Sequence, residues 1–160
     1  MKIRKAVPAD AKAIADIWWS AMLQQHLRYD PEYYAPKPEK QAKALKQKEA
    51  GKIIRGKDSF ALVADDNGVI GYSTAKMEFD RPFVVDTIGF VQNVAVLRGH
   101  RGKGVGRKLL GETIRELRKR GAKTISIMAD LRNKRAIKLY REAGFTDYYA
   151  EMRLIYPAVK

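Results

Sequence analysis

The sequence predicts an α/β fold in which one mixed sheet is flanked by helices, and three observations support this. The chain has 160 residues, which favours a single domain over residues 1–160 with a substantial core. Its composition, 46% hydrophobic and 31% charged, is typical of a globular protein. Segments with helix and strand periodicity follow in the order β-α-α-β-β-β-α-β-α-β, which places helices on the faces of a sheet.

The N-terminal part contains a short strand and two helices. Residues 2–5 are expected to form the first strand, and Pro8 with Asp10 suits a helix start. Apolar residues then recur at spacings of three and four, as one face of a helix requires: Ala11, Ile14, Ala15, Trp18, Ala21 and Met22. The proline-rich stretch YDPEYYAPKP (29–38) ends this helix, and a second helix is expected near residues 39–54.

The middle of the chain alternates strands with turns. SFALVAD (59–65) is a short apolar strand, and DNG (66–68) is a hairpin-turn signal before VIGYSTAKMEF (69–79). After a loop that begins with Arg-Pro, VDTIGFVQNVAVL (85–97) is a long strand. An irregularity in this strand is expected around Gly89.

The last third returns to alternating helix and strand. An apolar stripe over residues 105–117 predicts a helix, and Gly121 is placed as its C-terminal cap. KTISIMA (123–129) is the next strand. Asn133 is expected to cap the following helix, which ends at Gly144.

The last segment, FTDYYAEMRLIY (145–156), is expected to form the final strand. The exposed edge of such a strand can pair with the same strand of a second copy. A homodimer formed in this way is therefore one expectation for the assembly.

A glycine-rich loop lies between the long strand and the next helix. The stretch VAVLRGHRGKGVGRKLL (94–110) alternates Gly102, Gly104 and Gly106 with cationic residues. The first turn of a helix exposes unpaired backbone N–H groups, and glycines let an anion approach them closely. The loop therefore predicts a phosphate site, and a plain turn that starts a helix is the alternative.

Two common phosphate motifs do not fit this loop. A Walker loop needs Ser or Thr after Gly-Lys, but Gly104 is followed by Val105 and Gly106. A dinucleotide fingerprint needs a third glycine three residues after the second, and those positions hold Arg107 or Leu109.

Two other motifs resemble those of the GNAT N-acetyltransferase superfamily. The first is Arg101-x-x-Gly104-x-Gly106, preceded by Val94-Ala95-Val96 at the end of a strand. The second is Asn133-x-x-Ala136-x-x-Leu139-Tyr140-x-x-x-Gly144-Phe145. They cover residues 94–145, and the N-terminal half matches in element order alone. The resemblance implies a GNAT-like, mostly antiparallel sheet and an acetyl-CoA-dependent N-acetyltransferase.

The resemblance also implies a set of site residues, with acetyl-CoA as cosubstrate and no metal. Those implicated in binding acetyl-CoA are Val94, Ala95, Val96, Arg101, Gly102, Lys103, Gly104, Val105, Gly106, Arg107 and Asn133. A backbone N–H near Val96 would stabilise the oxyanion, and Tyr140 would protonate the departing thiolate as general acid. The alternative roles are a core position for Tyr140 and a helix cap for Asn133.

The sequence departs from the family pattern in two places. Arg98 stands where many members have proline. Gln92 and Asn93 stand where several members carry the glutamate that serves as general base, and neither amide accepts a proton at neutral pH. Other carboxylates are candidates for this role: Glu78, Asp86 and Asp130. The general base is therefore left unassigned.

The acceptor is left open among protein N-termini, lysines and small amines. Aromatic residues of the first two helices and of the central strand loop are candidates to line its cleft: Trp18, Trp19, Tyr29, Tyr33, Tyr34, Phe79 and Phe83. The net charge of +14 favours an acceptor presented on an acidic protein or a ribosome over a free polycation.

Two other functions remain as alternatives. One is a CoA-binding sensor domain without catalysis, which the missing glutamate keeps open. The other is a basic nucleic-acid-binding module that uses residues 37–57 and 107–120, although RNA-recognition and zinc-finger signatures are absent. His26 and His100 are too isolated in the sequence to suggest a metal site. No apolar run reaches the roughly 20 residues of a membrane span, and a cytoplasmic location is expected.

Overall fold

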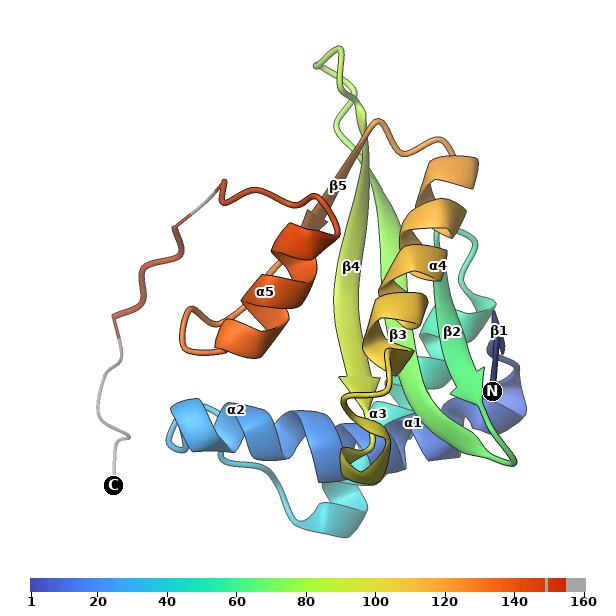
Figure 1. Ribbon diagram of the computed structural model, residues 1–160, viewed down its shortest axis with the longest axis vertical. Coiled ribbons are helices and arrows are strands. Elements are labelled where there is room, and N and C mark those ends of the chain that lie inside the picture. Colours follow the sequence, from blue (N-terminus) through green and yellow to red (C-terminus); the bar gives the residue numbers. More distant parts are fainter. Residues whose placement is uncertain (149, 155–160) are drawn as a thin grey trace.

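A computed structural model describes residues 1–148 and 150–154, and its centre is one twisted sheet (Figure 1). The strands lie in the spatial order β1-β2-β3-β4-β5. Neighbours are antiparallel from β1 to β4, whereas β5 is parallel to β4. The strands are β1 (Lys2–Lys5), β2 (Ser59–Asp65), β3 (Val69–Phe79), β4 (Thr87–Val96) and β5 (Thr124–Ile127). The expected mixed, mostly antiparallel sheet is confirmed.

Helices cover both faces of this sheet. The helices are α1 (Ala11–Ile17), the π-helical η2 (Trp18–Leu23), α2 (Gln24–Tyr29), α3 (Glu39–Arg55), α4 (Val105–Lys119) and α5 (Lys134–Glu142). Short 3₁₀ turns precede α1 and α4, at Pro8–Asp10 and Arg98–His100. α1, η2 and α2 form one continuous rod in Figure 1, so the first predicted helix is longer than its apolar stripe.

Each face of the sheet buries its own apolar cluster. On one face, α4 packs Leu109, Leu110 and Leu117 against strand residues that include Val91. On the other face, α1 and α3 pack against the central strands, and Ile14 and Tyr72 are fully buried there. Successive side chains of a strand point to opposite faces, so β2 and β3 supply both clusters. The sheet is therefore packed on both faces, and it supports the loops and helices that follow its strands.

The irregularity in β4 lies at Gln92, and the expectation of one around Gly89 is wrong. Thr74 pairs with Asn93 while Ala75 pairs with Val91, so Gln92 is an extra residue in a β-bulge. Gly89 pairs regularly with Met77. A side chain at Gly89 would lie 3.0 Å from Leu117, so this glycine makes room for α4.

β4 loses its neighbour on one side at the same point. β5 pairs with β4 from Ile88 to Val91, and no described residue pairs with β4 on that side after Val91. A bulge bends its strand and increases the local twist. The two strands therefore part at Gln92, and the last residues of β4 face open space.

Turns predicted from glycines have the backbone that was expected. Asn67 and Gly68 have φ of 57° and 135° in the β2–β3 turn. Gly121 and Gly144, at the ends of α4 and α5, have φ of 91° and 95°. Residues other than glycine rarely adopt the φ values of Gly121 and Gly144, so a single glycine determines where each of these helices ends.

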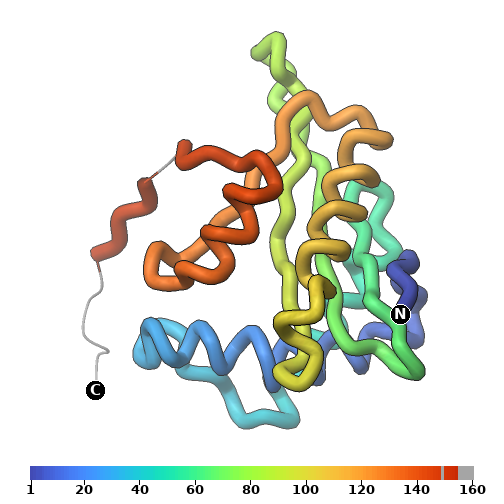
Figure 2. Tube along the Cα trace, in the orientation of Figure 1, coloured from blue at the N-terminus to red at the C-terminus, as the bar shows by residue number. Residues whose placement is uncertain are grey.

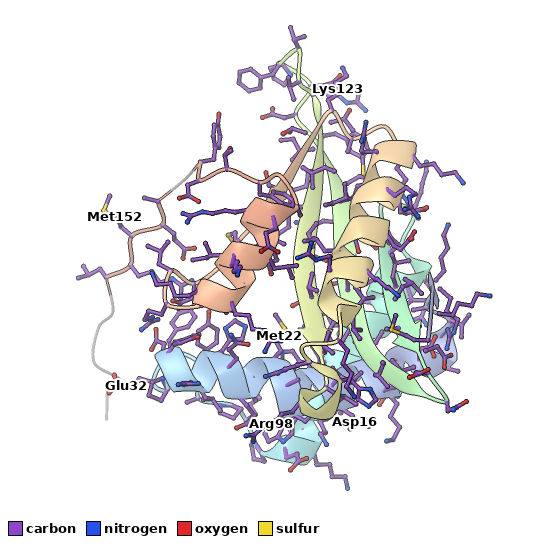
Figure 3. All side chains as sticks on the ribbon, viewed as in Figure 1. Asp16, Met22, Glu32, Arg98, Lys123 and Met152 are labelled. Atoms are coloured by element: carbon purple, nitrogen blue, oxygen red, sulfur yellow. The ribbon has the colours of Figure 1, made fainter. Side chains whose placement is uncertain are left out.

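The expected final strand is wrong for the described part of residues 145–156. Residues 145–148 and 150–154 are not in a strand, and residues 149, 155 and 156 lie outside the described residues. The segment leaves α5 and passes toward the end of α2 (Figures 1 and 2), where the Arg153 guanidinium lies 4.5 Å over the Tyr33 ring. Met152 is 93% exposed and points outward (Figure 3). An alternating pattern needs a neighbouring strand to pair with, and this path does not bring the segment to one. Homodimer pairing stays a prediction.

Candidate active site

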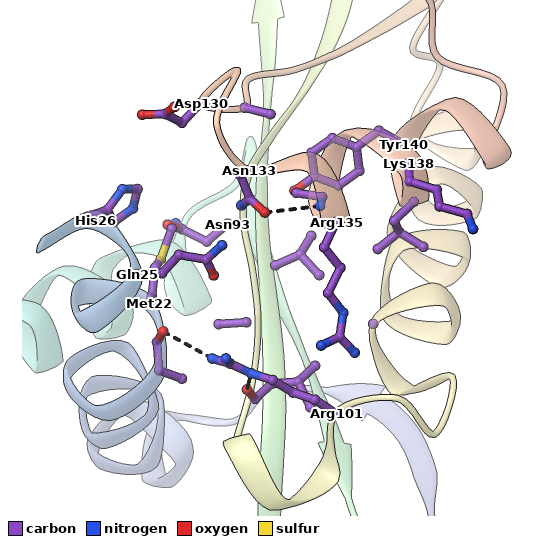
Figure 4. A pocket seen from close by; sticks show the side chains of 18 of the residues that line it. Met22, Gln25, His26, Asn93, Arg101, Asp130, Asn133, Arg135, Lys138 and Tyr140 are labelled. Atoms are coloured by element: carbon purple, nitrogen blue, oxygen red, sulfur yellow. Dashed lines mark hydrogen bonds between the residues drawn. The ribbon is translucent and has the colours of Figure 1, made fainter. Parts of the chain in front are cut away.

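A cleft of about 1020 Å³ opens where β4 and β5 part (Figure 4). Its walls come from η2 and α2, the end of β4, the glycine loop with the start of α4, and the segment from β5 into α5. All but one of the site residues predicted from the sequence line it: Val94, Ala95, Val96, Arg101, Gly102, Gly104, Val105, Gly106, Arg107, Asn133 and Tyr140. Lys103 is exposed on the same loop but does not line the cleft.

The end of β4 offers backbone groups to the cleft. The Leu97 N–H donates to the Ile70 carbonyl at 2.9 Å, so this facing pair is hydrogen-bonded. Facing pairs of an antiparallel ladder alternate, and the N–H groups of Val94 and Val96 therefore point away from β3. The Val96 carbonyl agrees with this direction, because it accepts from Arg101 rather than from β3. A ligand in the cleft can thus pair with β4 as a missing strand would.

The Arg101 side chain has a different role from the one its motif suggests. Its Nε donates to the Val96 carbonyl at 2.9 Å, and its Nη2 donates to the Ala21 carbonyl at 3.1 Å (Figure 4). Burial and the neighbouring guanidinium groups lower the pKa of Arg101. The Arg101 side chain therefore links the loop to β4 and to η2. Because its guanidinium is used in this way, contacts with a phosphate would come from the loop backbone.

The amides of the loop are available to an anion. No described residue accepts a hydrogen bond from the N–H groups of residues 102–107, and the first recorded acceptor along α4 is the Gly104 carbonyl, for Lys108. Gly102 and Gly104 have φ of 80° and 77°, and no side chain caps the N-terminus of α4. Unpaired amides at the positive end of a 15-residue helix can accommodate an anion, and anion binding by this loop stays a prediction.

Asn133 is a helix cap, as expected, and it also faces the cleft. Its Oδ1 accepts from the Ala136 N–H at 3.1 Å, which satisfies one free donor of α5 (Figure 4). Arg135 follows on the same helix, and its Nη2 lies 3.9 Å from where a Gly102 Cβ would be. α5 thus brings a second cation to the glycine loop.

Tyr140 lies two turns after Asn133 and lines the same cleft. Its ring packs edge-on to Phe145 at 6.3 Å, and the Phe145 N–H donates to its carbonyl. Burial raises the pKa of Tyr140 to about 12. The phenol is therefore protonated at neutral pH and can donate its proton into the cleft.

The carboxylates considered as general bases are poorly suited to that role. Glu78 and Asp86 do not line the cleft, and they pair with Lys76 and Lys123. Lys123 marks the opposite end of the sheet in Figure 3. Asp130 does line the cleft, but its hydrogen bonds with the Arg132 guanidinium lower its pKa to about 2. A carboxylate with that pKa holds a proton weakly at neutral pH.

Two adjacent amide side chains, those of Gln92 and Asn93, lie at the bulge. Asn93 Nδ2 donates to Thr74 Oγ1 at 2.6 Å, and both Gln92 and Asn93 line the cleft. The Gln92 Oε1 is covered and has no partner among the described residues. Neither amide is a base, so the family's glutamate has no counterpart at these two positions.

His26, whose isolation in the sequence argued against a metal site, lines the cleft from α2. Its ring stacks on Tyr34, with centroids 4.4 Å apart and planes 25° from parallel. Burial lowers the pKa of His26 below its ordinary value. No sequence motif marks this residue, because it comes near β4 through the packing of α2 and the loop that follows.

Of the seven aromatic residues predicted to line the acceptor's cleft, Tyr29 lines the cleft described above, and a role in acceptor binding stays a prediction. Tyr34 supports His26. Phe79 and Phe83 are 58% and 64% exposed and do not line it, since they lie at the far end of the β3–β4 hairpin. Trp18 packs against the core cluster beneath α1 and α3.

The charge around the cleft is positive. Its acidic residues are both paired, Asp130 with Arg132 and Glu142 with Arg107. The basic residues that line it are Arg28, Arg98, Arg101, Arg107, Arg132, Lys134, Arg135 and Lys138. Such a cleft attracts a polyanion and disfavours a polycation.

The sequence model of the acetyltransferase (GNAT) family matches residues 12–145. The fold has an open cleft beside a split sheet, and the match covers most of the chain. The chain therefore belongs to the acetyltransferase (GNAT) family, as its two motifs predicted.

Individual relatives agree with this family. The chain is 36% identical over 86 residues to L-methionine sulfoximine/L-methionine sulfone acetyltransferase of Salmonella typhimurium, covering 53% of this chain and 49% of that protein. It spans between 24% and 59% of the curated relatives it matches. A mutant protein from Bacillus halodurans shares the fold, with a TM-score of 0.85 at 18% identity over 98% and 100% of the two chains. The structure of an aminoglycoside N-acetyltransferase in complex with CoA matches with a TM-score of 0.67 at 17% identity. The match covers 98% of this chain and 93% of that one.

Two further expectations concern the whole chain. Among the helices of residues 1–148 and 150–154, none has the length and apolarity of a membrane span. No three His, Asp or Glu side chains within these residues gather as a metal site requires. A cytoplasmic location and the absence of a metal stay predictions.

Proposed function

We propose that this GNAT domain moves the acetyl group of acetyl-CoA to a primary amine by direct attack. The observation that carries the proposal is the opening between β4 and β5, where free strand amides and the unpaired amides of the glycine loop line one cleft. Acetyl-CoA has an extended amide-bearing arm and a pyrophosphate, which match these two features in kind.

The residues present fit such a cosubstrate. The amides of residues 102–107 would hold the pyrophosphate, and Arg107 and Arg135 would add positive charge beside it. Val94, Ala95 and Val96 would pair with the arm through the free edge of β4. Asn133 would contact the same arm from α5.

The chain's own groups would perform the chemistry that acetyl transfer requires. The Val96 N–H points into the cleft and would stabilise negative charge on the carbonyl oxygen. Tyr140, with a pKa of about 12, holds its proton until the sulfur leaves and then donates it. α2 and α5, which line the cleft from two sides, would hold the amine against the acetyl carbon.

The acceptor is proposed as an amine that is not a polycation. The positive charge around the cleft opposes a ligand with several ammonium groups. The names of similar proteins include acceptors of different kinds, methionine sulfone for one and aminoglycosides for another. Protein N-termini, lysines and small amines stay candidates, and so does an acceptor presented on an acidic or ribosomal partner.

The proposal is tested by thiol release from acetyl-CoA with three probes: L-methionine sulfone, sisomicin and a tripeptide with a free N-terminus. We expect an acetylated product from the sulfone or the peptide, identified by mass spectrometry, and the slowest transfer to the polycation sisomicin. A protein that neither binds acetyl-CoA nor releases thiol would overturn the proposal.

A CoA-binding sensor is the second candidate, because Gln92 and Asn93 replace the family's glutamate. Tight binding of acetyl-CoA with no thiol release, in the presence or absence of amines, would favour this candidate. Nucleic-acid binding by the basic helices stays a prediction.

A further inference from the structure

We propose that His26 is the general base of this domain and accepts the proton that the amine nitrogen loses during attack. The inference rests on the proposed function. His26 reaches the cleft from α2, Asn93 from β4 and Tyr140 from α5, and Figure 4 shows these side chains around one space. The base and the acid thus come from different walls, so that one can face the attacking nitrogen while the other faces the leaving sulfur.

The other titratable groups that line the cleft are in ion pairs, carry a proton already or lie at the phosphate end. Asp130 is held by Arg132, and Glu142 is paired with Arg107. Tyr140 is a protonated phenol, and the lysines and arginines are cations. His100 lies on the turn before the glycine loop, at the end that suits phosphate. His26 is therefore the lining residue with a free lone pair on the wall opposite α5.

The imidazole of His26 is held in place by its neighbours. Tyr34 stacks on it at 4.4 Å, and Tyr33 meets Tyr34 edge-on at 4.8 Å. The Arg153 guanidinium packs over Tyr33 and also hydrogen-bonds the Tyr34 side chain. A base fixed in this way needs no rearrangement before it accepts a proton.

The surroundings keep His26 neutral at pH 7. Burial has the largest effect and lowers its pKa, while the Asp130 carboxylate opposes this and raises it. Arg153 from the C-terminal segment and Lys46 from α3 lower it further. Arg132 partly neutralises Asp130. A neutral imidazole whose pKa lies below its ordinary value can accept a proton at neutral pH.

The proposed step balances as follows. The lone pair of the neutral amine forms the C–N bond, and the carbonyl pair moves to oxygen beside the Val96 N–H. His26 takes the proton that this nitrogen loses, directly or through one water molecule. The oxyanion pair then re-forms the C=O bond as the C–S bond breaks with its electron pair on sulfur, which receives the Tyr140 proton. Solvent returns the proton from the imidazolium to the phenolate.

Two substitutions test the role in kinetics, with saturating acetyl-CoA and the best of the three probe amines. His26→Gln is expected to lower kcat by about 100-fold or more and to remove the fall in kcat on the acid side of the pH profile. The affinity for acetyl-CoA should stay within about threefold. His100→Gln, at the chain's other histidine, is expected to keep that acid limb.

Chemical rescue separates proton transfer from a structural role. With His26→Ala, added imidazoles should restore turnover with rates that follow the pKa of the added base. Where no probe amine reacts, the slow release of thiol by water gives the same comparison, because water also loses a proton on attack.

Proton NMR supplies a readout that needs no turnover. The chain has two histidines, so the imidazole signal that remains in His26→Gln belongs to His100, and the one that remains in His100→Gln belongs to His26. We expect the His26 signal to titrate at a lower pH than an ordinary histidine side chain does. A wild-type acid limb that survives in His26→Gln would overturn the assignment, as would a His26 signal that titrates above 7. If the wild-type protein does not bind acetyl-CoA, the proposed function itself is overturned.

Discussion

The cap of α5 gives a prediction whose size follows from the structure. α5 has nine residues, of which Leu139 and Tyr140 are partly buried against the core and none is fully buried. Asn133 Oδ1 caps this helix at 3.1 Å from the Ala136 N–H. Replacing an Asn cap by Ala costs about 0.5–2 kcal/mol. Because little burial holds this short helix, we expect that cost to appear as fraying of α5 rather than as global unfolding.

Fraying of α5 would displace the residues that it brings to the cleft. Arg135 and Tyr140 both follow the cap, so ligand binding has to restore the helix at that cost. A cost of 0.5–2 kcal/mol corresponds to a loss of acetyl-CoA affinity of about 2- to 30-fold in Asn133→Ala. Asn133→Ser keeps a capping oxygen and removes the amide that would contact the cosubstrate.

Calorimetric titration and amide hydrogen exchange of the three proteins measure these effects. We expect faster exchange over residues 134–142 in Asn133→Ala and wild-type exchange in Asn133→Ser. Any affinity loss in Asn133→Ser then belongs to the lost direct contact. Wild-type exchange and wild-type affinity in Asn133→Ala would refute the reasoning.

Three further predictions concern single side chains. Ser73 and Thr113 share a buried 2.6 Å hydrogen bond, so Thr113→Val should cost about 1–3 kcal/mol in urea unfolding, and adding Ser73→Ala should recover most of it. Additive losses in the double variant would contradict this. The hydrogen bond from Arg4 lowers the pKa of the buried Asp10, so the stability that Asp10 contributes is present above pH 4 and is lost as pH falls through its folded pKa. Asp10→Asn should cost about 1.5–3 kcal/mol at pH 7 and weaken the acid dependence of unfolding, and an unchanged dependence would argue against the pair. Tyr140→Phe should lower kcat by about 100- to 10,000-fold while acetyl-CoA affinity is retained, and a Phe variant with wild-type kcat would exclude Tyr140 as the acid.

Local chemistry made much of the fold predictable. Gly121 and Gly144 end helices at positive φ, and the apolar stripe of α4 packs as its spacing predicted. The glycine loop was readable for the same reason, because Gly104 and Gly106 determine which backbone amides an anion can approach. Such features depend on a few neighbouring residues and need no knowledge of the rest of the chain.

Features that depend on distant partners were missed. The bulge at Gln92 comes from the register of β3 against β4, and nothing in the local sequence marks it. Arg101 pointed to phosphate by its motif, but carbonyl groups of Val96 and Ala21 take its guanidinium. His26 depends on how the loop after α2 folds back, and the last segment lacks the neighbour that a strand needs.

The most direct test of the account is calorimetric titration of acetyl-CoA with a matched pair of α4 glycine variants. Gly104 is unsuitable because its φ of 77° strains any other residue. A side chain at Gly106 would make ordinary contacts, 3.7 Å from Leu139 and 3.9 Å from Val96, and Gly111 has open space around it. Gly106→Glu should therefore fold while it places a carboxylate at the proposed pyrophosphate site, and Gly111→Glu is the control.

The account predicts binding by the wild type and by Gly111→Glu, and a loss of at least about 100-fold in Gly106→Glu, since facing like charges costs several kcal/mol. Binding that is equal in all three proteins would contradict the placement of the pyrophosphate on this loop. No binding by any of them would contradict the proposed function itself.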